Sequence, residues 1–302
     1  MREIIVQTAI YILTMALGYG LKRVGIFKSE DKKVLTNLIL YVTLPAALVS
    51  GFTGVQVDRW FLAAFLFGAV VNGLMVLSGI IAGRHKKPEM KAIYTINCQG
   101  FNMGNIAIPF LQNFFPAGIP YLCMFDVADA CFTLGATYSV ACIQLGKVQG
   151  SRLKNMVKGL LKSVPFDVYM IMTVLSLLNI SLPDEANQLI GFLGQGNACM
   201  AMLLVGISLE IKITKEEVWD VVHIIVTRYL VGAAAAAVMY FLIPAPLVMR
   251  QVLTVAMFSA VPNIALIYSS KLGVRTAVAS ALNPISTLMA IPVMAVFVML
   301  VQ

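Results

Sequence analysis

The chain has 302 residues, of which 60% are hydrophobic and only 12% are charged, and its mean hydropathy is +0.88. A water-soluble domain of this length could not bury so much apolar surface, so the composition excludes a soluble globular protein. The net charge of +8 does not indicate nucleic-acid binding, because the lysines and arginines lie in short loops between apolar segments.

Ten apolar segments are long enough to be membrane-spanning helices: 4–21, 35–54, 60–82, 92–112, 119–145, 164–180, 188–209, 221–243, 249–270 and 276–301. A hydrocarbon core about 30 Å thick needs about 20 apolar residues per helix. The runs are continuous and do not alternate, which favours helices over membrane strands. We therefore predict an all-α polytopic membrane protein with ten transmembrane helices.

The first segment is expected to remain in the protein, because it lacks a small-residue cleavage site and is followed by Lys22 and Arg23. Eighteen of the 22 basic residues lie in the loops after segments 1, 3, 5, 7 and 9. Short basic loops stay in the cytoplasm. The pattern predicts a multi-pass protein of the cytoplasmic membrane with both termini extracytoplasmic.

The second and fourth segments contain prolines at membrane depth. Pro45 lies in YVTLPAALVSG, and Pro109 lies in NCQGFNMGNIAIPFLQNF, residues 97–114. Next to Pro109 are three polar residues, Gln99, Asn102 and Asn105. Because proline has no amide hydrogen and pushes the preceding residue away from helical geometry, we predict that Pro109 interrupts the fourth helix.

The fifth segment contains two carboxylates, Asp126 and Asp129, which are three residues apart and so share a helix face. Ionisable groups at membrane depth usually face a transport pathway, so this pair is a candidate element for proton coupling. The alternative is that Asp126 lies at the outer interface in contact with water.

A polar linker, residues 147–163, divides the chain into five segments on each side, 1–146 and 164–302. Because five is odd, the second half must enter the membrane in the opposite sense, which is the arrangement of an inverted repeat. The ninth segment resembles the fourth: Pro262 lies 153 residues after Pro109 and is flanked by Ser259 and Asn263. We predict that the fourth and ninth helices are both broken.

Two broken helices that meet in the membrane would leave backbone polar groups for a ligand. Lipid cannot satisfy such groups, so they must face protein or a wet cavity. Amide ends of half-helices carry partial positive charge, which favours an anion and above all a carboxylate. The alternative is that each proline makes only a kink.

The remaining polar residues give weaker indications. Arg228, in the eighth segment, is expected to reach the inner interface or to pair with a carboxylate. The five cysteines and two histidines show no metal-ligand spacing, so we expect no metal site and no cofactor. The acidic, zinc and nucleophile motifs of intramembrane enzymes are incomplete or absent, so we do not expect an enzyme.

These motifs resemble the auxin efflux carrier family and its PIN-like bacterial transporters: the LP of Pro45, the GNIAIP of segment 4, the AVPNIA of segment 9, the VGISLE that ends segment 7, and the five-plus-five layout. The resemblance implies a scaffold of helices 1, 2, 6 and 7, and a transport domain of helices 3–5 and 8–10. It also implies helices 4 and 9 crossing at Pro109 and Pro262, Asn105 beside the substrate, elevator-type motion, and a homodimer. Family substrates are small organic anions, such as auxin or dicarboxylates.

The predicted function is therefore a secondary transporter of a small organic anion. The substrate site is predicted to include the following residues: Asn102, Asn105, Pro109, Ser259, Pro262, Asn263, Pro45 and Gln99. Asp129 stands where the family often has an amide, so coupling to H⁺, to Na⁺ or to neither ion remains open. A sodium-coupled symporter of the bile-acid type is the alternative, and a channel or an intramembrane enzyme is more remote.

Overall fold

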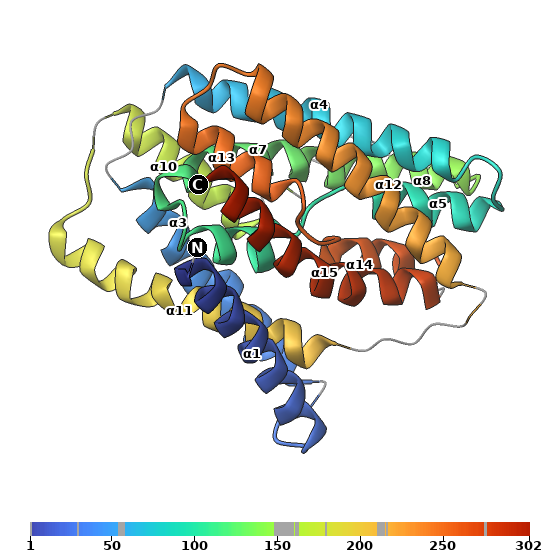
Figure 1. Ribbon diagram of the computed structural model, residues 1–302, viewed down its shortest axis with the longest axis horizontal. Coiled ribbons are helices and arrows are strands. Elements are labelled where there is room, and N and C mark those ends of the chain that lie inside the picture. The colour runs from blue at the N-terminus through green and yellow to red at the C-terminus, as the bar shows by residue number, and fades with distance from the viewer. Residues whose placement is uncertain are drawn as a thin grey trace.

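The computed structural model describes residues 2–28, 30–53, 58–147, 160, 163–178, 180–209, 215, 217–274 and 277–302. All the regular structure in these residues is helical, as Figure 1 shows. The elements of the first half are α1 (Arg2–Arg23), α2 (Asp31–Leu38), η1 (Ile39–Thr43), α3 (Leu44–Phe52), α4 (Arg59–Ala82), α5 (Pro88–Cys98), η2 (Met103–Ala107), α6 (Ile108–Leu111), η3 (Pro116–Gly118), α7 (Ile119–Cys131), η4 (Phe132–Thr137) and α8 (Tyr138–Gln144). Those of the second half are α10 (Val164–Leu177), α11 (Asp184–Ser208), α12 (Val218–Ala237), η5 (Val238–Leu242), α13 (Leu247–Ala256), α14 (Asn263–Lys271) and α15 (Ala277–Val301).

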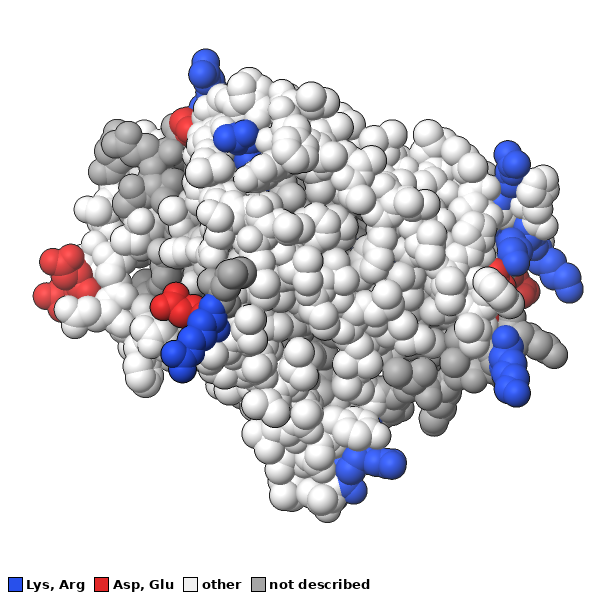
Figure 2. Space-filling model, viewed as in Figure 1, with Lys and Arg blue, Asp and Glu red and all other residues white. Residues whose placement is uncertain are grey.

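Seven helical stretches among the described residues are long and apolar enough to cross a membrane. This confirms the prediction of an all-helical polytopic membrane protein. The other three predicted segments are shorter or interrupted: α5 with α6, α10, and α13 with α14. On the face seen in Figure 2, charged side chains lie near the edges, and a broad band without charge separates them. The predicted linker, 147–163, lies largely outside the described residues.

Glycines allow α1 and α11 to touch backbone to backbone. A Cβ atom on Gly206 would overlap the carbonyl oxygen of Met15, and a Cβ on Gly18 would lie 2.5 Å from the carbonyl oxygen of Leu203. Small residues permit this close approach in membrane proteins, where packing rather than water exclusion holds helices together. The two halves of the chain are thus joined at this contact.

The structure corrects the prediction that Pro109 breaks its helix. Pro109 is the second residue of α6, and the preceding Ile108 has helical backbone angles (φ −62°, ψ −52°). A five-residue π-helix, η2, comes directly before α6, and a second one, η1, comes before α3 and Pro45 in the same way. A π turn contains one extra residue, which moves the nearest carbonyl away from the proline ring and lets the helix continue.

Candidate functional site

Two chain interruptions meet inside the helical bundle. The first separates α5, which ends at Cys98, from η2, which begins at Met103. The second separates α13, which ends at Ala256, from α14, which begins at Asn263 after Pro262. The backbone N–H of Asn102 donates a hydrogen bond of 2.9 Å to the carbonyl of Ala260. The interruptions are therefore joined directly, although they lie in different halves of the chain.

Gly100 is required at the first interruption for two reasons. Its φ angle is +82°, which L residues with a side chain rarely adopt. A Cβ atom at this position would also lie 2.8 Å from Cγ of Pro262. The close approach of the two interruptions thus depends on the missing side chain.

Arg228 of α12 binds both interruptions. Its Nη1 donates to the carbonyls of Asn97 and Cys98 at 3.1 and 2.8 Å, and its Nη2 donates to that of Gly100 at 2.8 Å. Longer contacts of 3.4 Å reach the carbonyls of Gln99, Ser259 and Ala260. The residue is only 3% exposed. Because the side chain is buried, the expectation that it reaches the inner interface was wrong. Its hydrogen-bond partners among the described residues are backbone carbonyls, and it makes no direct ion pair with a carboxylate there.

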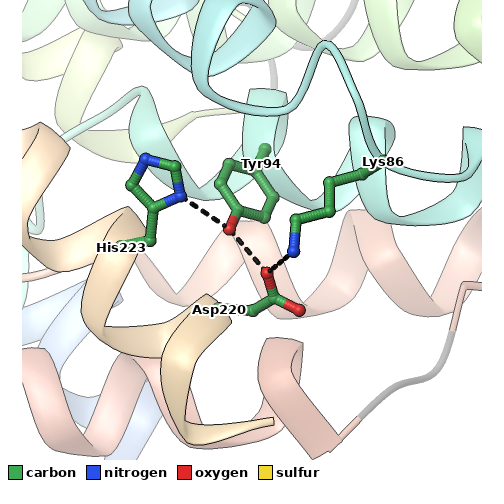
Figure 3. A network of polar contacts seen from close by, with 4 residues as sticks. All are labelled: Lys86, Tyr94, Asp220 and His223. Carbon is green, nitrogen blue, oxygen red and sulfur yellow. Dashed lines mark hydrogen bonds and ion pairs between the residues drawn. The ribbon is translucent and has the colours of Figure 1, made fainter.

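A second polar attachment, about one turn before Cys98, also holds α5 to α12. Figure 3 shows the Tyr94 hydroxyl between Asp220 and His223: it donates to Oδ1 of Asp220 at 2.6 Å and lies 3.1 Å from Nδ1 of His223. Lys86 forms an ion pair of 2.6 Å with the same oxygen of Asp220. Through Arg228 and this network, α12 contacts α5 at two positions and fixes the half-helix that leads into the first interruption.

A small cavity of about 20 Å³ lies beside the joined interruptions. It is lined by Asn102, Asn105, Asn263, Asn283, Thr287, Ser208, Leu204, Val205, Leu209 and Pro284. Among the described residues, its polar lining consists of four side-chain amides and two hydroxyls and includes no charged side chain. The Thr287 hydroxyl is buried and has no hydrogen-bond partner, so it is available to a ligand in the cavity.

The second interruption is held by α15 as well. The side-chain amide of Asn283 donates to the carbonyl of Val261 at 2.6 Å, and the hydroxyl of Ser286 accepts from the N–H of Val261 at 3.0 Å. The hydroxyl of Ser259 donates to the carbonyl of Asn102 at 3.2 Å. These bonds satisfy backbone groups that no helix satisfies, and Asn263, the first residue of α14, lines the cavity.

Asp129 belongs to a buried polar cluster next to the first interruption. The Gln99 amide nitrogen lies 3.3 Å from Oδ1 of Asp129, 2.8 Å from Oδ1 of Asn72 and 3.0 Å from the hydroxyl of Thr133. Asp126 lies apart from this cluster and accepts a 2.7 Å hydrogen bond from the hydroxyl of Tyr169 in α10. No group of three or more metal-ligating side chains comes together among the described residues.

The structure therefore separates the predicted site residues into groups. Asn102, Asn105 and Asn263 line one cavity, and Ser259 and Pro262 lie at the adjoining interruption. Gln99 faces the Asp129 cluster, outside the residues that line the cavity. Neither Pro109 nor Pro45 lines the cavity, and the Pro109 carbonyl accepts from the hydroxyl of Tyr11 at 3.2 Å.

The sequence reasoning missed Asn283, Thr287 and Ser208. The two halves were aligned through Pro109 and Pro262, but a second repeat in the sequence aligns them better. The tripeptide Asn-Ile-Ala occurs at Asn105 and again at Asn263, 158 residues later. The same spacing relates Pro88, which starts α5, to Pro246, which caps α13. When the two halves are aligned in sequence with this offset of 158 residues, Thr287 corresponds to Asp129, and the first interruption aligns with the second.

A larger cavity of about 240 Å³ lies between the start of α11 and the ends of α3 and α6. Its polar lining includes Gln195 on α11, with Gln112 and Asn113 just after α6. Both this cavity and the smaller one therefore have one wall on α11 and another on the segment that contains η2 and α6.

The membrane transport protein family matches residues 3–150, which extend from α1 past the end of α8. The matched part contains the first interruption, the Gln99–Asp129 cluster and two of the cavity asparagines. No curated protein matches the chain. Residues 3–150 thus match the membrane transport protein family, the family of the auxin efflux carriers, and this match indicates that the protein is a membrane transporter.

Proposed function

We propose that the protein is a secondary transporter of a small organic anion, and that the cavity lined by Asn102, Asn105, Asn263 and Asn283 is its substrate site. The observation that carries the proposal is the direct contact of two chain interruptions beside that cavity, through the hydrogen bond from Asn102 N–H to the carbonyl of Ala260. Backbone that leaves the helix inside a bilayer is characteristic of transporter binding sites.

The charge around the cavity favours an anion. The carbonyl ends of α5 and α13 carry partial negative charge, and Arg228 neutralises them by contacting carbonyls of both interruptions. The amide end of α14, which starts at Asn263, lies at the cavity. A carboxylate there could accept from amide nitrogens and from the unpartnered hydroxyl of Thr287.

The size and position of the two cavities support alternating access. The smaller cavity holds about one water molecule, so a substrate can enter only if its walls separate. Both cavities have one wall on α11 and another on the segment of η2 and α6. We propose elevator-type motion of α4–α8 and α12–α15 against a scaffold of α1–α3, α10 and α11.

The spacing of 158 residues supports two inverted repeats. It relates Asn105 to Asn263 and Pro88 to Pro246, and each pair occupies the same place relative to its interruption. We propose that the three short or interrupted segments complete ten spans with the seven long ones. The basic loops then place both termini outside the cytoplasm, and a homodimer is the proposed assembly.

The test is counterflow in proteoliposomes. Vesicles preloaded with an unlabelled small mono- or dicarboxylate should accumulate the labelled form, with and without sodium, because a carrier exchanges substrate without net driving force. Asn263→Ala and Thr287→Val should each raise the concentration for half-maximal exchange at least tenfold, whereas Asn113→Ala, outside the small cavity, should leave it unchanged. Absence of exchange for every carboxylate tested, in protein that is folded and monodisperse, would contradict the proposal.

Coupling is tested at the two carboxylates of α7. We propose that Asp129 carries a proton, because it contacts Gln99 of the first interruption, whereas Asp126 contacts Tyr169 of α10. Asp129→Asn should make the transport rate independent of an imposed pH gradient, and Asp126→Asn should retain the dependence. If both variants respond to the gradient as the parent does, the proton is carried elsewhere.

A further inference from the structure

An apolar groove of about 820 Å³ lies between α4 and α12. It is lined by Ala63, Leu66, Phe67, Val70, Val71, Leu74, Leu77, Ser78, Ile81, Leu230, Val231, Ala234, Ala235, Val238 and Ile243. The single hydroxyl in this lining, that of Ser78, donates to the carbonyl of Met75 at 2.8 Å. The groove therefore offers a ligand hydrocarbon contact and no free polar group.

The sequence explains why a hollow forms here. Residues 233–237 of α12 are five consecutive alanines, and two of them, Ala234 and Ala235, face the groove opposite leucines and valines of α4. Its lining on α4 extends from Ala63 to Ile81, which at 1.5 Å per residue is about 27 Å. This length is close to the thickness of the hydrocarbon core, about 30 Å.

Each of the two helices that line the groove has a tryptophan in its first turn, outside the groove lining. On α12, Trp219 comes 11 residues before Leu230, the first residue of the lining. Trp60 is in the first turn of α4, one turn before Ala63, and Trp219 is in the first turn of α12 and is 78% exposed. They are the two tryptophans of the chain. The two helices run in opposite directions, because Asp220 at the start of α12 contacts Lys86, just after the end of α4. Tryptophan concentrates where hydrocarbon meets headgroups, so the two rings mark opposite interfaces.

The end of the groove near Ile81 is basic. The loop after α4 carries exposed Arg84 and Lys87, while Lys86 is engaged by Asp220, and Glu89 is an exposed acid in the next turn. In Figure 2 several basic side chains gather at the right-hand edge, where Figure 1 places the connection from α4 to α5. Cations beside an apolar groove between membrane helices are the arrangement that binds anionic headgroups.

We propose that this groove binds an anionic phospholipid, with its acyl chains along α4 and α12 and its phosphate near Arg84 and Lys87. A second copy of the chain fits less well. A twofold axis along the membrane normal would bring two basic loops together at one interface, and like charges there repel. The bound lipid packs against α12, the helix that carries Arg228, so the lipid influences the transport site through that helix.

The experiment measures thermal unfolding of the purified protein in neutral detergent. Phosphatidylglycerol and phosphatidylcholine with identical acyl chains are added separately, and glycerol 3-phosphate supplies the headgroup without chains. Phosphatidylglycerol should raise the Tm of the parent by about 3 °C or more, and the other two ligands should not. Native mass spectrometry should show the same selectivity in the lipid adducts.

Two independent variants locate the site, each with a matched control. Ala234→Phe fills the groove, whereas Ala233→Phe adds the same ring to an exposed neighbour outside it. Arg84→Gln with Lys87→Gln removes the headgroup contacts, whereas Lys28→Gln with Lys33→Gln removes two exposed cations elsewhere, from the end of the loop after α1 and from the first turn of α2. The groove and loop variants should lose at least half of the Tm shift, and the controls should retain it.

Three results would overturn the proposal. Phosphatidylcholine could stabilise the parent as much as phosphatidylglycerol, or the shift could persist in both Ala234→Phe and the Arg84 and Lys87 variant. Alternatively, Ala234→Phe could turn a dimer into a monomer while phosphatidylglycerol gives no shift, which would make this face an interface between copies. None of these measurements depends on transport, so they stand apart from the proposed function.

Discussion

Arg228 is a buried cation whose hydrogen-bond acceptors are backbone carbonyls of two separate chain interruptions. Its guanidinium also lies 5.6 Å from the ring of Phe101, within the range of a cation–π contact. A planar group with five N–H donors can serve several carbonyls at once, which an ammonium group cannot do as well. The type of residue therefore matters here, in addition to its charge.

Replacing Arg228 by Met should reduce transport more than tenfold and lower the free energy of unfolding by about 3 kcal/mol, because several buried carbonyls lose charged hydrogen bonds. Arg228→Lys should recover part of the stability but little of the transport rate. Arg250 provides the control, since its Nη1 contacts a single carbonyl, that of Tyr240, at 3.0 Å. Chemical denaturation and counterflow measured on the same preparations check both effects, and equal losses in the Arg228 and Arg250 variants would contradict this role.

At the scale of elements, the interruptions depend on local geometry more than on proline. Gly100 combines a positive φ with a Cβ position 2.8 Å from Pro262. Pro262 has extended backbone angles (φ −69°, ψ 146°) and precedes α14, whereas Pro109 lies within α6 after a π turn. The two prolines therefore have different structural roles, although the sequence around them is similar.

Gly100→Ala should abolish most transport, because the new methyl group pushes the two interruptions apart. Gly25 is a matched control: it has the same φ of +82°, but nothing lies within 4 Å of its Cβ position. In both variants an alanine must adopt a positive φ angle, which costs about 1 kcal/mol or more. Only Gly100→Ala should reduce the exchange rate further than this backbone strain explains. Similar exchange rates in the two variants would show that the close contact is dispensable.

Pro262→Ala should slow transport several-fold, since the free N–H lets α14 extend backwards into the interruption. Pro109→Ala should retain more than half of the parent rate, because residue 109 is already helical. Initial rates of labelled substrate uptake, normalised to inserted protein, compare the two. A larger loss at Pro109 than at Pro262 would contradict the structure of the interruptions.

The sequence predicted the all-helical membrane class, because the length of apolar segments depends on simple solvation. Seven of the ten predicted segments correspond to helical stretches long and apolar enough to cross a membrane among the described residues. The sequence also identified three cavity asparagines through their position beside proline. It failed at Pro109, since a π turn that accommodates proline leaves no signature in composition. It failed at Arg228 as well, because the carbonyls that bind it exist only once two distant interruptions have formed.

At the scale of the whole molecule, α11 forms a wall of both cavities and is also packed tightly on α1 through Gly18 and Gly206. Backbone contact of this kind resists sliding, so α1 and α11 should behave as one body. The interruptions belong to the segments on the other side of the cavities. In the proposed motion, the small cavity opens when the distance between α11 and those segments increases.

A cross-link between α11 and the end of α6 should stop transport. Cysteines replacing Gln195 and Gln112, both lining the larger cavity, can be joined by a bifunctional reagent in a background without native cysteines. As a control, Gly73→Cys with Phe132→Cys joins α4 to η4, where a Cβ atom at Gly73 would lie 3.7 Å from the ring of Phe132. Exchange should fall at least tenfold for the first pair only and return when a cleavable reagent is reduced; continued exchange in the cross-linked protein would exclude relative motion.

The distance in sequence between Gly100 and Arg228 has a consequence for synthesis on the ribosome. These partners are 128 residues apart, and at about 5–20 residues per second the arginine is made roughly 6–26 s after the glycine. During this delay the carbonyls of the first interruption have no cation, and lipid cannot replace it. The nascent segment must therefore remain a continuous helix or stay beside the translocon, so the contact between the two interruptions and Arg228 forms only late in biogenesis.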